Sequence, residues 1–408
     1  MELGGQIGTA GNFDANGKGD CFVSIELKQS EGIIFKLESK VKVFYGKSIE
    51  GLCRSILGFF SVENASVIIN DSGALPYVIA ARMESAIKQV VSSNKEFLFD
   101  FLPDNLHKSN KDQFRFSRLY LPGNTPYMML NAGIHKPNGI ILDLEDAVAI
   151  SKKNDARYIV RNALRSQNFY GAERMVRINQ GQFGLEDLAF IVPHNVHLIL
   201  IPKCESRAEI DRIEEEIAKI KQQVNLTQDI FLMPIIETAL GVENAYEIAS
   251  ASRNIVAMAI GLEDYTADLG VQRTNSGAES LYGRIRVVNA CHAAKIQAID
   301  SVFSDVGDMQ ALAENVKRSK SLGFQGMGCI HPRQISVIHE NFAPNCEEIE
   351  RAKKIVNAFY EAERNGLSVV SVGTKMVDPP VVKRQLKVLE LAINLGILPK
   401  DWRSDYVG

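Results

Sequence analysis

The sequence predicts an α/β protein whose main part is a closed (β/α)8 barrel, known as a TIM barrel. Eight short apolar runs follow one another along the chain, and amphipathic stretches of helical length separate them. Continuous apolar strands that alternate with helices favour a parallel sheet covered on both faces, and eight such units fit a closed barrel. The runs are residues 116–121, 139–143, 175–179, 197–203, 231–237, 255–264, 296–300 and 326–331.

Each run ends in polar or charged residues, which is the second observation behind this prediction. Examples are the strings LDLED, PK, IETA and GLED. In a (β/α)8 barrel the chemistry takes place at the C-terminal ends of the strands. We therefore expect the active site where these strings lie.

The regions on either side of the barrel are predicted as separate parts. Residues 1–91 read as a small α+β domain, residues 92–112 as a linker, residues 113–340 as the barrel and residues 341–408 as a helical lid or subunit-contact segment. In the first part we expect a Gly- and Asn-rich opening, strands at 21–27, 32–37 and 65–70, and helices at 47–60 and 76–91. In the last part we expect a polar connector at 341–348, helices at 349–364 and 377–395, and a strand at 367–372.

The composition narrows the class of protein. The net charge is −3 and the basic residues are dispersed, so neither nucleic acid nor a membrane surface is an expected partner. The first residues have no signal-peptide pattern, and no stretch approaches the 18 apolar residues of a membrane span, so we expect a cytoplasmic protein. The six cysteines show neither zinc spacing nor a disulfide pattern.

Two carboxylates, Glu237 and Asp264, are the predicted metal ligands. They follow the apolar runs 231–237 and 255–264, so we expect them to point into the barrel mouth from neighbouring strands. Two carboxylates with waters and substrate oxygens suit Mg²⁺, with Mn²⁺ as an alternative. Each carboxylate could instead cap the helix that follows it.

A second group of charges follows the second, third and fourth runs. Asp143, Glu145 and Asp146 end the second run, and a cluster of acids there needs partners. Arg177 ends the third run and could hold a substrate carboxylate or carbonyl, pair with the acidic cluster, or do both at once. Lys203 ends the fourth run and could act similarly as a point charge.

Asp378 is the candidate in the C-terminal part. It precedes Pro379 in the string MVDPPVV. Taken alone, this pattern is that of a helix N-cap followed by a favoured first helical residue.

From Phe116 to its end the chain resembles the citrate lyase β-subunit/malyl-CoA lyase (HpcH/HpaI) family of barrel enzymes. The matching strings are SRLYLPGN, ILDLEDAV, MVRINQ, LIPKCES, PIIETALG, AIGLEDYTADLG, IQAIDSV and GMGCIHPRQI, in the order of the family. The resemblance implies Mg²⁺ at Glu237 and Asp264 and Arg177 at the polarised oxygen of the substrate. The string MVDPPVV resembles the C-terminal lid of the CoA-ester lyases, whose aspartate reaches the site of a neighbouring subunit.

From the resemblance we expect Arg177, Asp378 and Glu145 to act in catalysis. Lys203, Asp143 and Asp146 are expected to contact the substrate.

Residues 1–91 resemble the citrate lyase acyl-carrier (γ) subunit. The shared strings are LESKVKVFYGKSIE and VIINDSGALPYVIAARMESAI, together with an early Gly-Thr. That family attaches a CoA-like arm to a serine just before the first strand. The corresponding loop here, GTAGNFDANGKGD, contains no serine, so we expect this part to act as a docking or structural module.

The implied activity is Mg²⁺-dependent cleavage of a 3-hydroxyacyl-CoA thioester, of the malyl-CoA or citramalyl-CoA type, to acetyl-CoA and a 2-oxo acid. A homotrimer or hexamer is expected. Three alternatives stay open at this point: the citryl-thioester lyase subunit of a citrate lyase complex with its own partner subunits, a pyruvate-type aldolase, and a non-catalytic scaffold that binds CoA esters.

Overall fold

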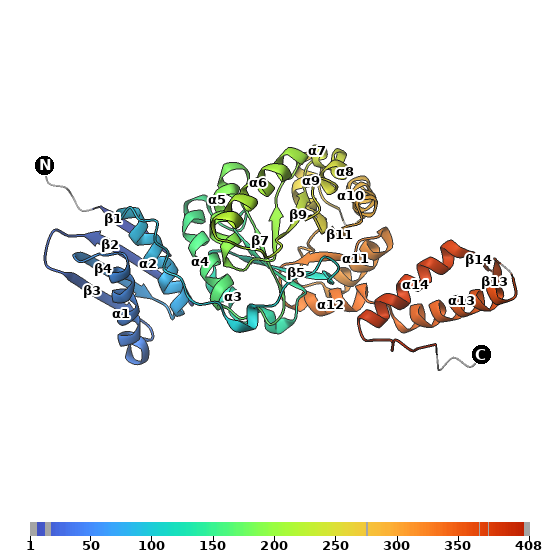
Figure 1. Ribbon diagram of the computed structural model, residues 1–408, viewed down its shortest axis with the longest axis horizontal. Helices are drawn as coiled ribbons and strands as arrows, with labels where there is room; N and C mark the ends of the chain where they lie inside the picture. The colour runs from blue at the N-terminus through green and yellow to red at the C-terminus, as the bar shows by residue number, and fades with distance from the viewer. Residues whose placement is uncertain (1–5, 13–17, 275, 367, 374, 404–408) are drawn as a thin grey trace.

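The computed structural model describes residues 6–12, 18–274, 276–366, 368–373 and 375–403. These residues form three parts in a row, with an N-terminal α+β unit at one end, a barrel in the middle and a helical arm at the other end (Figure 1). Among the helices described, none combines the length and apolar character that crossing a bilayer requires.

The N-terminal unit is a four-stranded sheet, in the order β1-β2-β4-β3, with two helices. The pairing is antiparallel except between β3 and β4. Its buried apolar residues alternate along the strands and face α1 and α2, which have buried faces of their own. The elements are β1 Ile7–Ala10, β2 Cys21–Leu27, β3 Ile33–Ser39, α1 Lys42–Phe59, β4 Ala65–Asp71 and α2 Pro76–Val90.

Two expectations for this unit need correction. The opening contains β1, an edge strand that was not predicted because its Gly-Thr-Ala sequence lacks apolar alternation. Helix α1 begins at Lys42, five residues before the predicted start, and runs through Gly46. The predicted carrier loop lies partly outside the described residues, since 13–17 are not among them.

The closed parallel barrel predicted from the sequence is confirmed. Its strands close in the order β10-β11-β12-β5-β6-β7-β8-β9. They are β5 Ser117–Pro122, β6 Gly139–Asp143, β7 Glu173–Arg177, β8 Leu198–Ile201, β9 Phe231–Ile236, β10 Ala257–Ile260, β11 Gln297–Asp300 and β12 Gly326–Cys329.

Helices cover the outside of the barrel, and a second apolar cluster fills its lumen. The longer helices are α4 Lys153–Ser166, α5 Gly181–Ile191, α6 Arg207–Gln223, α10 Leu281–Ala294, α11 Met309–Leu322 and α12 Arg333–Phe342. The shorter helices are α3 Pro126–Met129, α7 Ala239–Glu243, α8 Ala245–Ala249 and α9 Leu262–Asp268, with 3-10 turns at Pro103–Asn105, Ala132–His135, Ile150–Lys152 and Val192–His194.

Two barrel strands, β7 and β10, differ most from their predicted bounds. Strand β7 begins at Glu173, two residues before the predicted run, because Glu173 pairs with Arg115 at 2.7 Å and both side chains are fully buried. The run 255–264 is strand only to Ile260, and its last residues belong to α9. At charged strand ends the prediction therefore began β7 too late and ended β10 too late.

The arm consists of α13 Cys346–Arg364, the hairpin β13 Val370–Val372 and β14 Lys375–Val377, and α14 Pro379–Asn394. The connector predicted at 341–348 is shorter than expected, because Asn345 forms a capping box with Glu348 and starts α13 early. The two helices pack along each other, and the hairpin lies at the end of the arm away from the barrel (Figure 1).

Candidate active site

A cavity of about 380 Å³ opens at the C-terminal ends of the barrel strands. Of the residues predicted for the site, Asp143, Asp146, Arg177, Glu237 and Asp264 line this cavity. Glu145 and Lys203 contact members of this group, whereas Asp378 lies in the arm. The barrel thus brings together residues that are up to 121 positions apart in the sequence, from Asp143 to Asp264.

Glu237 and Asp264 belong to neighbouring strand units. Strands β9 and β10 pair directly, and the amide of Gly261 donates to the carbonyl of Ile236 at 2.9 Å. Glu237 directly follows β9 and is buried. The sequence predicted Asp264 at the end of a strand. It lies instead in the first turn of α9, where it faces Lys203.

The geometry does not support the capping alternative for Glu237. Its Oε2 accepts a hydrogen bond from the amide of Lys203 at 3.1 Å, across to the loop after β8. The helix after β9 is capped instead by Thr238, whose hydroxyl accepts from the amide of Gly241. Gly261 makes room for the Glu237 carboxylate, since a Cβ there would lie 2.5 Å from Oε1.

The electrostatics around Glu237 suit a cation. Burial raises the pKa of Glu237 to about 7, Arg177 opposes the rise, and Asp264 and Glu145 add to it. A buried carboxylate beside other carboxylates keeps its charge more readily when a cation is bound. Among the described residues, no group of three or more His, Cys, Asp or Glu side chains is arranged to hold a metal. Two carboxylates are the kind of donor that Mg²⁺ takes when water and substrate oxygens fill its other positions.

Arg177 is held by the acidic cluster that follows β6. Its Nε and Nη2 donate to the two oxygens of Asp143, both at 2.7 Å, and Nη1 lies 3.0 Å from Glu145 Oε2. The Nε–Nη2 edge is therefore occupied by Asp143. The predicted ion pair with the acidic cluster is present, and the guanidinium carbon lies 5.4 Å from the centre of the Tyr120 ring. The predicted contact of Arg177 with a substrate oxygen stays a prediction.

Glu145 and Lys203 connect the two charged groups. Glu145 accepts a hydrogen bond from the side-chain amide of Gln180 at 2.8 Å. Burial raises the pKa of the Glu145 carboxyl, although Arg177 opposes the rise. The Lys203 ammonium lies 3.3 Å from Asp264 and 3.7 Å from Glu145. Burial lowers the pKa of Lys203, but the neighbouring carboxylates outweigh burial and raise it above its ordinary value. Lys203 therefore stays charged between the predicted metal ligand and the acidic cluster.

Asp378 does not reach the cavity of its own chain. It is the N-cap of α14, with its Oδ1 accepting from the amide of Val381 at 3.1 Å. The opposite half of α14 packs toward the barrel, since Leu391 and Leu395 contact the main apolar cluster. Asp378 is 13 residues before Leu391 on this helix, which is about 20 Å.

Sequence reasoning missed two residues of the cavity, Arg118 and Tyr120. Both lie on β5 and point into the lumen, because residues two apart on a strand share a face. The available signal was Arg118 itself, a charged residue inside an otherwise apolar run.

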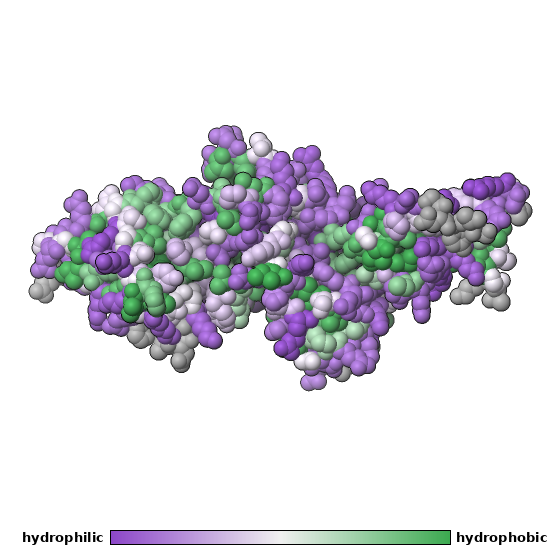
Figure 2. Space-filling view, turned by 90° about the horizontal axis from the view of Figure 1, so that it is seen from below, coloured by the Kyte–Doolittle hydropathy of each residue, from purple (hydrophilic) through white to green (hydrophobic). Residues whose placement is uncertain are grey.

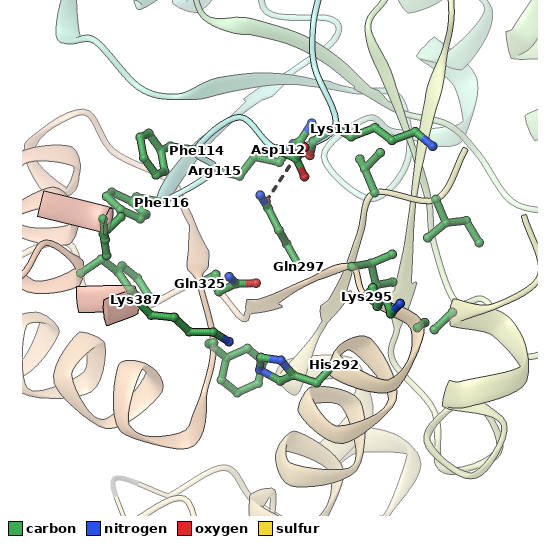
Figure 3. Close-up of a pocket in the computed structure, with 18 of the residues that line it drawn as sticks. Lys111, Asp112, Phe114, Arg115, Phe116, His292, Lys295, Gln297, Gln325 and Lys387 are labelled. Carbon is green, nitrogen blue, oxygen red and sulfur yellow. Dashed lines mark hydrogen bonds between the residues drawn. The ribbon is translucent and has the colours of Figure 1, made fainter. Parts of the chain in front are cut away.

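A larger cavity, about 950 Å³, lies at the opposite end of the barrel, where the strands begin. Figure 3 shows Gln297 pointing toward Arg115, which donates a hydrogen bond to it, with Lys387 of α14 on another side of the cavity and His292 and Lys295 at the end of α10. It contains none of the clustered carboxylates. Residues at this face of a (β/α)8 barrel serve stability, so we place the active site in the smaller cavity.

Comparison with known proteins identifies the family of the barrel. The sequence profile of the HpcH/HpaI aldolase/citrate lyase family matches residues 117–332, more than half of the chain. The chain belongs to this family. The family takes its name from aldolases and citrate lyase, which are carbon–carbon lyases.

Two relatives are named for different substrates, citrate and citramalyl-CoA. Citrate lyase subunit beta of Haemophilus influenzae is 38% identical over 283 residues, which cover 69% of this chain and 97% of that protein. The mitochondrial citramalyl-CoA lyase of Mus musculus is 30% identical over 292 residues, which cover 68% of this chain and 86% of that protein.

A solved structure shares the fold. The crystal structure of protein CitE from Mycobacterium tuberculosis in complex with magnesium, acetoacetate and coenzyme A superimposes with a TM-score of 0.58 and 28% identity, covering 69% of this chain and 99% of that chain. The predicted resemblance of the barrel is therefore confirmed.

The N-terminal unit matches a second family. Residues 9–90 match the profile named ACP, the malonate decarboxylase delta subunit (MdcD). This confirms the predicted resemblance of the N-terminal part to an acyl-carrier subunit.

Proposed function

We propose that this protein is a Mg²⁺-dependent lyase that cleaves a 3-hydroxyacyl-CoA thioester, of the malyl-CoA or citramalyl-CoA type, to acetyl-CoA and a 2-oxo acid. The observation that carries the proposal is the position of Glu237 and Asp264 on neighbouring strand units, in one cavity with Arg177. The citramalyl-CoA lyase relatives, and the magnesium and coenzyme A in the CitE crystal structure, support it.

The roles of the residues follow from their contacts. When bound at Glu237 and Asp264, Mg²⁺ supplies a Lewis acid for the oxygen that becomes the ketone. Arg177 is fixed in place by Asp143 and Glu145, so its positive charge is preorganised for the negative charge that develops on the thioester fragment. Lys203 and Asp146, at the edge of the cluster, contact the substrate.

Asp378 acts from a neighbouring subunit in this proposal. It returns a proton to the carbon freed by cleavage, and removes one in the synthetic direction. The arm supports a subunit contact, because it exposes apolar side chains: Val369, Met376, Leu386 and Ile397. Figure 2 shows such apolar surface on the arm. We propose a homotrimer or hexamer in which each arm covers another chain's cavity and excludes water.

The metal role is tested by Glu237→Gln. We expect this variant to lose lyase activity on malyl-CoA and citramalyl-CoA by about 10³-fold, because one of two metal ligands loses its charge. Product detection with Mg²⁺ and with chelator measures the loss. Glu247→Gln, the same change at an exposed position of α8, should keep full activity. Full rescue of Glu237→Gln by added Mg²⁺ would show that Glu237 is not a ligand.

The role of Asp378 is tested by mixing subunits. Asp378→Asn alone should lose roughly 10²–10⁴-fold in rate and keep Mg²⁺ binding. The Asp378→Asn variant is then refolded or co-expressed with the Glu237→Gln variant. The hybrid oligomers should regain activity, because some cavities have both an intact pair of metal-binding carboxylates and an intact Asp378 from the neighbouring subunit. Wild-type turnover by Asp378→Asn, or mixtures without any recovery, would contradict the arrangement.

A second candidate is the citryl-thioester lyase subunit of a citrate lyase complex. The observation that favours it is the N-terminal match to an acyl-carrier family next to a barrel 38% identical to a citrate lyase subunit beta. Purification of the native protein distinguishes the two, since a complex would bring partner subunits with it.

A further inference from the structure

The side chain of Arg118 is buried inside the barrel without a carboxylate partner. It is 1% exposed, and among the described residues no ion pair includes it. Its Nε has no hydrogen-bond partner, and its Nη1 contacts only the sulfur of Met233, at 2.9 Å. A buried guanidinium without a counter-ion is costly to a fold, which is why buried charges are almost always paired.

Most other buried arginines have a carboxylate partner: Arg115 pairs with Glu173, Arg161 with Glu84, and Arg284 with Asp300. Arg174 is in none of the ion pairs described, but its guanidinium donates to the backbone carbonyl and the side-chain oxygen of Asn195. Burial lowers the pKa of Arg118 to about 10, and Tyr120, Cys329 and Glu173 oppose this fall. At neutral pH the side chain therefore still carries its charge.

Arg118 lies across the lumen on the floor of the active-site cavity. It starts on β5 and ends at Met233 on β9, and these strands are opposite each other in the barrel order. Both of its partners in register, Gly139 and Gly328, lack side chains, and a Cβ on Gly139 would lie 3.5 Å from Arg118 Cγ.

The cavity reaches down to this level through small residues. Gly328 and Ala259 line it together with Arg118. Tyr120 stands directly above Arg118 on the same strand, and Arg177 lies over the Tyr120 ring. A ligand that binds at the rim, beside the carboxylates of Glu237 and Asp264, therefore has its inner side toward the Arg118 guanidinium.

We propose that Arg118 binds a carboxylate of the substrate, and that the 2-oxo acid released by this enzyme is a dicarboxylate. The inference rests on the proposed lyase function and, among its candidate substrates, favours the citryl thioester over the malyl and citramalyl types. In a 3-hydroxyacyl thioester of this kind, the carbon that bears the hydroxyl also bears a carboxylate and one further substituent. That substituent is hydrogen in a malyl thioester, methyl in a citramalyl thioester and carboxymethyl in a citryl thioester. Only the last of these brings a second carboxylate, and Arg118 supplies a counter-charge for it.

The probes are two stable 2-hydroxy acids, malate and lactate, which differ by one carboxylate. Calorimetric titration into the full chain with Mg²⁺ present should show malate binding about 10- to 100-fold more tightly than lactate, the value of a hydrogen-bonded charge. Arg118→Met should remove this preference and leave the affinity for lactate unchanged. Its melting temperature should equal or exceed that of the wild type, because an unpaired buried charge is lost.

Two further variants complete the test. Arg118→Lys keeps the charge without the planar fork, so we expect an intermediate preference for malate. Met233→Leu changes the neighbour of Arg118 but not the charge, and should behave as the wild type does. If Arg118→Met does not fold, the test uses the ratio of the malate and lactate affinities in the wild type and in Arg118→Lys. A smaller ratio in Arg118→Lys supports the role of Arg118, and an equal ratio contradicts it.

Turnover separates this inference from the proposed function. The ratio of kcat/KM for citryl-CoA to that for citramalyl-CoA should fall in Arg118→Met. An unchanged ratio, or equal binding of malate and lactate by the wild type, would overturn the role of Arg118 while leaving the lyase function in place. A malate preference that depends on Arg118 in a protein that cleaves none of these thioesters would support the anion site and refute the lyase function.

Discussion

The N-terminal unit and the C-terminal arm flank the same barrel, but they are attached to it in different ways. The buried residues of the N-terminal unit, from Ala10 to Ile87, belong to the same apolar cluster as the outside of the barrel. The arm has an apolar cluster of its own, built by α13, α14 and β14. Within the part of the arm that the structure describes, the contacts to the main cluster come from Leu391 and Leu395, at the end of α14.

Polar contacts also attach the N-terminal unit to helix α4 of the barrel. Arg161 of α4 donates to both oxygens of Glu84 on α2, at 3.0 and 2.6 Å, and both side chains are fully buried. Asp155 of α4 accepts hydrogen bonds from the amide of Gly11 and the hydroxyl of Ser85. The loop that would hold a carrier's prosthetic group thus begins against the barrel. These contacts fix the acyl-carrier-like unit against the barrel, whereas the arm has a core of its own and is tied to α11 by the pair of Lys320 with Glu348.

The largest effect is expected where the N-terminal unit meets the barrel. Glu84→Gln should lower the free energy of unfolding by about 3–5 kcal/mol, because Arg161 is left buried with an incomplete partner. Urea denaturation measures the change. Glu50→Gln is the matched control, since its pair with Arg54 is about half exposed and contributes less than about 1 kcal/mol. Equal effects in the two variants would mean that the N-terminal unit is not anchored through Glu84.

The arm should respond to mutation by itself. Phe359→Ala removes a core side chain of the arm and should cost about 3 kcal/mol in the opening of α13 and α14. Hydrogen exchange should show faster exchange in the arm and unchanged protection in the barrel. Phe342→Ala is the control on the barrel side, where Phe342 stacks on Phe116 at 5.7 Å. Loss of protection in the barrel of Phe359→Ala would contradict an independent arm.

Acid should weaken the barrel side of the molecule through His194. Burial, together with Arg161 and Arg165, lowers the pKa of His194 to about 3. Its unfolded pKa is about 6.5, so the unfolded chain binds the proton first, and stability is lost as the pH falls from about 6.5 toward 3. At pH 5 this amounts to about 2 kcal/mol.

The measurement compares unfolding at pH 7.5 and pH 5. His194→Gln should lose about 2 kcal/mol less than the wild type over this interval. His135→Gln, at an exposed position, should follow the wild type. Residues 346–408 contain no histidine, so opening of the arm should not show this dependence. If the opening of the arm showed the same loss of stability between pH 7.5 and pH 5, the two regions would not differ in the way described.

The sequence determined the repeating architecture of this protein. Strands β2 and β6 have the bounds that their apolar residues predict, and the alternation of strands and helices sufficed for the barrel. The positions of Glu237 and Arg177 at strand ends were also visible, because parallel strands in a closed barrel present their C-terminal ends together. These features depend on local periodicity, which a single sequence displays.

Only the tertiary structure decided how the charged residues are paired. Glu173 extends β7 because Arg115, 58 residues earlier, neutralises it in the interior. Asp264 reaches the site from a helical turn, and Asp143 occupies the edge of Arg177 that a substrate could have used. Arg118 is one charge among apolar residues in the sequence, and only the closed barrel shows that no carboxylate faces it. Pairing of buried charges depends on contacts between distant segments, and for that reason it cannot be predicted from local pattern.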